Sequence, residues 1–305
     1  MVCLGEKPNE PPKPRPADLE YHGFTMLLSC VQSHVSFADV SDNFRRVEAW
    51  LNKANAANAD LVVLPECMLT GYGFESREEA FAQSMTSDDP AWEKLISICR
   101  IHGRLHVVVG FLEREGPGNE AKLFNASALL GPNGMITIYR KVHLPHLGVD
   151  RFVDRGNRPY VPHQAGMAKV GLAICYDCSF PEPMRVLGLG GADIIALPTN
   201  WPVAASRTAD IVPPARSMEN HLFFIAANRV GEERGFKYCG RSSICGPDGV
   251  ELARAGNDTE EILFAEVDLA QARNKRIERT PGAHVIDRFA DRQPKFYRDI
   301  IREND

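Results

Sequence analysis

Short apolar runs alternate with longer amphipathic segments along this chain. An apolar run at residues 24–31 precedes a segment at 42–58 whose apolar residues recur on one helical face, and a second apolar run follows at 61–64. Because side chains repeat about every two residues in strands and about every 3.6 in helices, this order predicts a β-α-β unit. An acidic start with proline at residues 88–90 predicts another helix before an apolar strand at 105–112.

The second half of the chain repeats this pattern. Strands are predicted at residues 168–174, 192–197 and 222–227, separated by a helix that opens at Pro181 and another that ends near Asn220. Helices that alternate with apolar strands predict an α/β protein whose mixed sheets are covered by helices.

Two predicted hairpins interrupt the alternation. Strand-like runs at 123–130 and 135–140 flank the turn Gly-Pro-Asn-Gly, and runs at 239–245 and 250–254 flank Gly-Pro-Asp-Gly. Each hairpin follows two β-α segments, so the similar turns predict a structural duplication.

The composition excludes several classes of function. Among 305 residues, 35 Lys and Arg stand against 40 Asp and Glu, and the net charge of −5 does not suit a nucleic-acid-binding surface. The apolar runs are shorter than the roughly 18 residues that a membrane-spanning helix needs. Eight cysteines are spread along the chain and do not form a dense disulfide framework. We therefore expect reduced thiols, a cytoplasmic location and a small-molecule partner, with no nucleic acid and no membrane.

Three regions differ in composition. Residues 1–22 carry five prolines among charged residues, which disfavours helices and strands and predicts an extended N-terminal arm. Residues 23–280 hold the alternating pattern and are expected to form the domain. Residues 281–305 are polar and rich in arginine, which predicts a C-terminal tail outside the core.

Three reactive side chains directly follow predicted strands. Glu66 follows the second apolar run, Lys141 the first hairpin, and Cys175 the strand that begins the second half. Sites in α/β proteins gather at the carboxyl ends of strands, so a base, a cation and a nucleophile are expected to meet there. The helix start after Cys175 is expected to lower the pKa of its thiol. Singly, each residue also has an ordinary interpretation as a helix cap, a solvated lysine or a buried apolar filler.

Short motifs surround these residues. They are Leu64-Pro65-Glu66, Tyr139-Arg140-Lys141-Val142-His143-Leu144, Cys175-Tyr176-Asp177 with Phe180-Pro181-Glu182, Ala215-Arg216 with Glu219-Asn220, and Ala227-Asn228-Arg229. In this order they resemble the nitrilase superfamily of carbon–nitrogen hydrolases, and the match extends over roughly residues 24–268. The resemblance implies an α/β fold, an α-β-β-α sandwich of two mixed sheets flanked by helices, and a homodimer or higher homo-oligomer.

The resemblance also implies a role for each residue. Cys175 is the nucleophile, Glu66 is the base that takes its proton and later activates water, and Lys141 stabilises negative charge. The backbone N–H of Tyr176 completes the oxyanion hole. A small-molecule amide is then cleaved through a thioester, with release of ammonia or an amine. No metal and no organic cofactor is implied.

Many members of this family carry a second glutamate in a loop after the lysine. Here Asp150 occupies that position and is followed by Phe152 and Gly156. The shorter acid and the single aromatic residue depart from the family pattern. The resemblance implies that Asp150 orients the substrate; the alternative is a loop ion pair with Arg151 or Arg155.

The substrate class is predicted from the neighbourhood of the nucleophile. A Tyr-Asp dipeptide follows Cys175 and resembles the amidase and carbamoyl-amide branches, whereas true nitrilases usually carry Trp-Glu. Later segments at 213–220 and 226–231 look most like aliphatic amidases acting on ω-amino amides, with carbamoylputrescine-type amidases as the alternative. A cationic substrate would need an acid such as Asp150, Asp177 or Glu182 at the pocket mouth.

The cysteines also permit a different class of function. Cys175 and Cys178 form a CxxC, which with Cys239 and Cys245 has the composition of a zinc site, or alone that of a redox pair. Cys239 and Cys245 lie in one strand-like run, which would separate them by roughly 20 Å and suits zinc poorly. A non-catalytic scaffold on the same fold is a third hypothesis.

Overall fold

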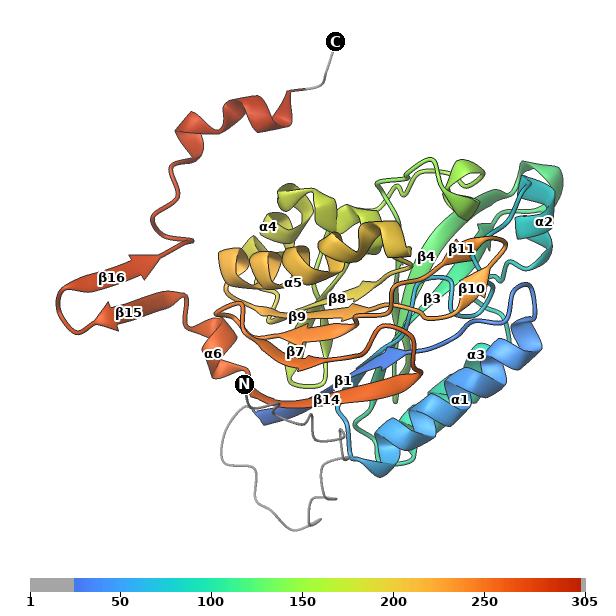
Figure 1. Ribbon diagram of the computed structural model, residues 1–305, viewed down its shortest axis with the longest axis horizontal. Coiled ribbons are helices and arrows are strands. Elements are labelled where there is room, and N and C mark those ends of the chain that lie inside the picture. Colours follow the sequence, from blue (N-terminus) through green and yellow to red (C-terminus); the bar gives the residue numbers. More distant parts are fainter. Residues whose placement is uncertain (1–24, 303–305) are drawn as a thin grey trace, which may run out of the picture.

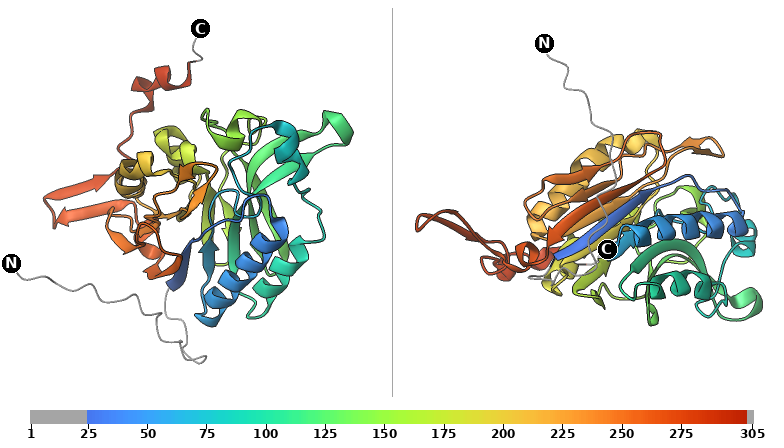
Figure 2. Two further views of the ribbon diagram at one scale, coloured as in Figure 1. Left: turned by 45° about the vertical axis from the view of Figure 1, so that its right-hand side comes forward. Right: turned by 90° about the horizontal axis from the view of Figure 1, so that it is seen from below.

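The computed structural model describes residues 25–302, so the predicted arm at 1–22 lies outside the described residues. Two six-stranded mixed sheets pack face to face, and helices cover the outer face of each sheet (Figures 1 and 2). The predicted α-β-β-α sandwich is therefore confirmed.

The first sheet has the strand order β14-β1-β2-β3-β4-β5. Its elements are β1 (Thr25–Gln32), α1 (Val40–Ala56), β2 (Leu61–Val63), α2 (Arg77–Ala82), α3 (Trp92–Arg100), β3 (His106–Glu115), β4 (Lys122–Gly131), β5 (Gly134–Arg140) and β14 (Glu261–Asp268). β1, β2 and β3 are parallel, while β4 is antiparallel to both β3 and β5. β5 therefore runs in the direction of β2, and both strands end at the same edge of the sheet.

The second sheet repeats this plan in the order β13-β12-β9-β8-β7-β6. Its elements are β6 (His163–Ala165), β7 (Ala168–Leu172), α4 (Pro181–Leu189), β8 (Ile194–Pro198), α5 (Ser206–Asn220), β9 (Phe223–Ala227), β12 (Ser243–Cys245) and β13 (Glu251–Arg254). Three parallel strands are again followed by an antiparallel hairpin, and an antiparallel edge strand lies on the other side, β6 here and β14 in the first sheet. The two sheets thus match strand for strand.

Smaller elements complete the chain. They are β10 (Glu232–Glu233), β11 (Phe236–Lys237), α6 (Ala270–Arg273), β15 (Arg276–Thr280), β16 (His284–Asp287) and the 3-10 helices η1 (Gly118–Glu120), η2 (Gly148–Arg151), η3 (Cys175–Ser179), η4 (Val203–Ala205), η5 (Pro294–Phe296) and η6 (Arg298–Ile301).

The core has three apolar layers. Val62 on β2 points to the layer beneath α1 and α3, whereas its neighbour Val63 points to the layer between the sheets. Ile194 and Ile195 on β8 divide in the same way between the central layer and the layer beneath α4 and α5. Because successive side chains of a strand point to opposite faces, strands that are buried on both faces must be apolar throughout.

Several predicted boundaries differ from the structure, and two of the differences have a clear local cause. α1 begins before residue 42 because the Asp39 side chain accepts a hydrogen bond from the backbone N–H of Asp42 and caps the helix. The strand predicted at 239–245 covers only β12, because Gly240 and Arg241 adopt positive φ angles that interrupt an extended backbone.

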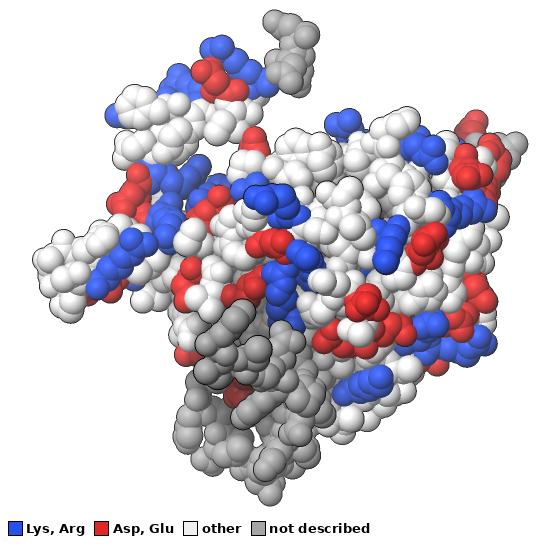
Figure 3. Space-filling view, viewed as in Figure 1, with Lys and Arg blue, Asp and Glu red and all other residues white. Residues whose placement is uncertain are grey.

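The C-terminal region leaves the sandwich after β14. The β15–β16 hairpin and the segment with η5 and η6 project from the body (Figure 1, red). The predicted tail boundary at residue 281 falls in the turn of this hairpin. The face in Figure 3 carries acidic and basic side chains side by side over the body. No helix within residues 25–302 has both the length and the apolar character needed to cross a membrane.

Candidate active site

Glu66 is fully buried in the loop that follows β2. This loop lies directly against Gly110 on β3, where an added Cβ would be 2.5 Å from the Cys67 nitrogen and 2.7 Å from the Glu66 Cα. Those distances are shorter than any van der Waals contact, so only glycine lets the loop approach the strand this closely.

Lys141 directly follows β5 and forms ion pairs with two carboxylates. Its Nζ lies 2.6 Å from Glu66 Oε1 and 2.5 Å from Asp150 Oδ2, and all three side chains are fully buried. Because β2 and β5 end at the same edge of the sheet, Glu66 and Lys141 meet although they lie 75 positions apart.

Asp150 completes a buried cluster with Glu66 and Lys141. It lies in η2, and its Oδ2 accepts a hydrogen bond of 2.8 Å from the Tyr72 hydroxyl. Its carboxylate therefore pairs with Lys141, and not with Arg151 or Arg155 as in the alternative interpretation.

Asn125 connects the two carboxylates. Its Nδ2 donates to Glu66 Oε1 at 2.7 Å and to Asp150 Oδ1 at 2.8 Å. Asn125 is not among the residues predicted from sequence. A lone amide within the apolar strand β4 is nevertheless a recognisable signal, because a buried polar group needs partners. Tyr72, which donates to Asp150, and Thr199 and Asn200, which donate hydrogen bonds to the Cys175 thiol, were not predicted either.

Cys175 opens η3 after β7 and has a φ angle of 44°, which is strained for any residue other than glycine. Burial, together with the Glu66 carboxylate, raises the pKa of its thiol to about 12, although Lys141 and hydrogen bonds from Asn200 and Thr199 oppose this. The expectation of a lowered pKa is therefore wrong, because desolvation outweighs the nearby positive charge.

Burial and the neighbouring charges also shift the pKa values of Glu66 and Lys141. Burial raises the pKa of Glu66 more than Lys141 lowers it. Burial alone would lower the pKa of Lys141, but Asp150 and Glu66 outweigh it and hold that pKa well above its usual value. Glu66 Oε2 has no hydrogen-bond partner among residues 25–302. The cluster thus offers a fixed cation and a carboxylate oxygen that is free to accept a proton.

The described chain matches the model of one protein family, "Carbon-nitrogen hydrolase", over residues 27–277. The chain belongs to the carbon-nitrogen hydrolase family. It is an enzyme of the nitrilase superfamily that hydrolyses carbon–nitrogen bonds.

The relatives of this carbon-nitrogen hydrolase match it over most of its length. A nitrilase of Pyrococcus abyssi is 37% identical, over 88% of this chain and 98% of its own. A 2-oxoglutaramate amidase of Bacillus subtilis is 30% identical, over 82% and 93%. An N-carbamoylputrescine amidase of Arabidopsis thaliana is 28% identical, over 89% and 95%. Among solved structures, a mutant amidase of Nesterenkonia AN1 from the nitrilase superfamily has the same fold, with a TM-score of 0.73, 23% identity and coverage of 90% and 97%.

The acids expected at the mouth of the substrate pocket of this hydrolase are placed differently. Asp177 is fully buried and accepts a hydrogen bond from the backbone N–H of Ile174, and Asp150 is held by Lys141. Glu182, in the first turn of α4, is exposed. Asp150 and Asp177 therefore serve internal contacts, which excludes them as free carboxylates at a pocket mouth.

The cysteines of the hydrolase give no metal cluster in the part of the chain that is described. Within residues 25–302, no group of three or more His, Cys, Asp and Glu side chains is placed to hold a metal ion. The seven cysteines of this range are free thiols. Cys239 lies outside β12, and its Sγ is 3.4 Å from Asn228 Nδ2.

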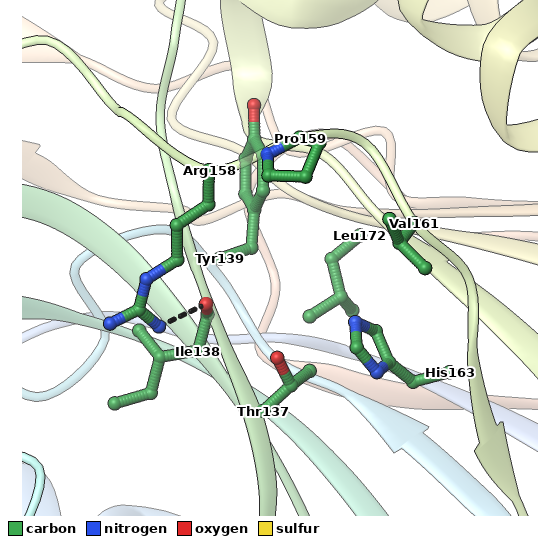
Figure 4. A pocket seen from close by; sticks show the side chains of 8 residues that line it. All are labelled: Thr137, Ile138, Tyr139, Arg158, Pro159, Val161, His163 and Leu172. Carbon is green, nitrogen blue, oxygen red and sulfur yellow. Dashed lines mark hydrogen bonds between the residues drawn. The ribbon is translucent and has the colours of Figure 1, made fainter.

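A cavity of about 220 Å³ is lined by residues of β5, β6 and β7 and of the loop that precedes β6 (Figure 4). Tyr139 contributes its ring to this cavity and donates its hydroxyl hydrogen to Asp177 Oδ2 at 2.7 Å. Arg158 is turned toward the Ile138 carbonyl, which accepts a hydrogen bond of 2.9 Å. The lining residues are Thr137, Ile138, Tyr139, Arg158, Pro159, Val161, His163 and Leu172. Glu66, Lys141 and Cys175 are not among them, so this cavity is distinct from the cluster.

Proposed function

We propose that this enzyme hydrolyses the amide bond of a small molecule, with Cys175 as the nucleophile. The observation that carries the proposal is a neutral thiol beside a base: the pKa of Cys175 is about 12, and Glu66 has a raised pKa and a free carboxylate oxygen. A thiol of this kind is protonated near neutral pH, so its attack requires a neighbouring base.

The proposed reaction follows from these groups. Glu66 takes the Cys175 proton as the sulfur adds to the carbonyl carbon. Lys141 Nζ and the Tyr176 N–H stabilise the oxyanion, and one such donor typically contributes about 3 to 4 kcal/mol. The protonated Glu66 gives its proton to the leaving nitrogen as the carbon–nitrogen bond breaks and a thioester forms. Glu66 then takes a proton from a water molecule as the water oxygen adds to the thioester carbon. The carbon–sulfur bond breaks, the acid is released, and the sulfur regains its proton from Glu66.

Asp150 acts in this proposal through Lys141. Its carboxylate binds Nζ directly, and Asn125 and Tyr72 fix it in turn. It therefore orients the cation that meets the substrate oxygen, which differs from a direct contact with the substrate.

The proposed substrate is an aliphatic or ω-amino amide. The Tyr-Asp dipeptide after Cys175 and the segments at 213–220 and 226–231 support this class. An N-carbamoyl amine is the second candidate, supported by the relative named N-carbamoylputrescine amidase. We also propose a cytoplasmic homo-oligomer, supported by the free thiols and by exposed apolar side chains outside the core.

The test is ammonia release from a panel of aliphatic amides, ω-amino amides, N-carbamoyl amines and nitriles. We expect turnover of an amide by the native enzyme and a loss of several orders of magnitude in Cys175→Ala. Cys245→Ala, which removes a buried thiol from β12, is the matched control and should retain turnover. Turnover that survives in Cys175→Ala would overturn the mechanism, and turnover of nitriles alone would overturn the substrate class.

A further inference from the structure

Asp177 is a fully buried carboxylate that contacts two separate segments of the site. Its Oδ2 accepts hydrogen bonds from the Ile174 N–H at 2.9 Å and from the Tyr139 hydroxyl at 2.7 Å. Its Oδ1 accepts a hydrogen bond of 3.1 Å from the His143 N–H and lies 2.7 Å from His143 Nδ1. One carboxylate thus joins the loop after β5 to the turn after β7.

The turn after β7 carries the nucleophile. Cys175 has a left-handed backbone, which costs of order 1 to 3 kcal/mol and persists only where neighbouring contacts hold it. The side chain of Asp177 bonds to the N–H of Ile174, while the backbone N–H of Asp177 donates to the Ile174 carbonyl at 3.0 Å. These two bonds close the turn around Cys175 from both sides.

The loop after β5 carries the cation. His143 lies two positions after Lys141, and both its backbone N–H and its ring contact Asp177. The imidazole ring of His143 also stacks on the ring of Phe180, with the two ring centroids 4.0 Å apart and the ring planes at 17°. Asp177 and Phe180 both belong to the nucleophile side, so His143 is held from that side by two different interactions.

We propose that Asp177 and His143 are positioning residues that set the distance between Lys141 and the backbone N–H of Tyr176. This inference rests on the proposed function, in which these two donors share the oxyanion. The donors come from different sheets, so neither sheet alone fixes their separation. A displacement of about 1 Å between such groups costs on the order of 100-fold in rate.

The experiment compares three variants of the full-length enzyme. Asp177→Asn keeps the shape of the side chain but replaces one acceptor oxygen with an NH2 group. This donor then faces groups that themselves donate hydrogen bonds to Asp177 in the native enzyme. We expect kcat to fall roughly 100-fold with a smaller change in KM, because the oxyanion forms only in the transition state. His143→Gln removes the ring contacts at a partly exposed position, so folding is retained, and kcat should fall about tenfold.

Tyr160→Phe is the matched control. The Tyr160 hydroxyl lies 3.3 Å from Asp177 Oδ1 and 3.4 Å from His143 Nδ1, but Tyr160 belongs to neither the loop after β5 nor the turn after β7, so its loss leaves the direct contacts between them in place. We expect its kcat to stay within about twofold of native. A double variant of Asp177→Asn and His143→Gln should be no slower than Asp177→Asn alone, because both substitutions break the same connection.

Alkylation of Cys175 by iodoacetamide gives a readout that needs no amide turnover. We expect His143→Gln to leave this rate within about twofold of native, since the nucleophile turn is intact, and Asp177→Asn to lower it. Effects on kcat that add fully in the double variant, or kcat and alkylation in Asp177→Asn equal to native, would overturn the inference. An enzyme without amide turnover in any form would overturn the proposed function instead, and the alkylation rates would still decide whether Asp177 holds the turn.

Discussion

One amide side chain lies between the two carboxylates that share Lys141. Asn125 donates to Glu66 and to Asp150, so it stabilises the charged form of both. In Asn125→Asp a third carboxylate replaces this donor, and the pKa of Glu66, already raised by burial, should rise further. Since Glu66 must be ionised to act as a base, activity would then be lost at a higher pH as the solution is acidified. The measurement is the pH dependence of kcat/KM. If kcat/KM of the variant fell at the same pH as that of the native enzyme, or at a lower pH, the prediction would be contradicted.

The thiol of Cys175 gives a second prediction at this scale. It is the partly exposed cysteine among the seven described, while the other six are buried, so iodoacetamide should label it first within residues 25–302. Because its pKa is about 12, the labelling rate should rise about tenfold per pH unit from about pH 7 to pH 9. Mass spectrometry of quenched samples measures this. A rate that levels off below pH 9 would contradict the raised pKa.

At the scale of elements, periodicity predicted the central strands and the longer helices of both halves, because buried strands are apolar throughout and the helices have one apolar face. It did not predict α2 or the edge strands β6 and β14. Local backbone geometry was harder to predict from the sequence. Arg241 has a positive φ angle that shortens β12, and nothing in its residue type signals this. Motifs selected Glu66, Lys141 and Cys175 as candidates. Asn125 and Tyr72 contact these groups through strand register and loop packing, which short motifs do not record.

The packing of the Glu66 loop on β3 gives a prediction at the same scale. Gly110→Ala inserts a methyl group against the backbone of residues 65–67, so the loop must move. We expect a loss of about 1 to 3 kcal/mol in unfolding free energy together with a large fall in kcat. Val109→Ala, at the next and equally buried position, should lower stability to a similar extent while keeping most of kcat. Urea denaturation and ammonia release separate the two effects, and equal kcat values in the two variants would contradict the argument.

At the scale of the whole molecule, the two matching sheets explain why the cluster lies where it does. Glu66 and Lys141 follow strands of the first sheet, and Cys175 follows a strand of the second. The similar turns of the two hairpins predicted the repetition of the strand plan, but no single-residue signal predicted which strand ends would face each other. That arrangement depends on how the sheets stack through the central layer.

The projecting C-terminal segment carries the last prediction. Phe296 and Ile301 are 75% and 85% exposed, and Val186 and Leu189 on the outer face of α4 are also exposed. Strongly exposed apolar side chains on a segment that projects from the body favour contact with another molecule. If a second copy of the chain covers it, Phe296→Ser with Ile301→Ser should lower the mass measured by light scattering at micromolar concentration. Since neither side chain belongs to the core of the sandwich, circular dichroism of the variant should match that of the native enzyme. An unchanged mass would show that these side chains do not hold copies together.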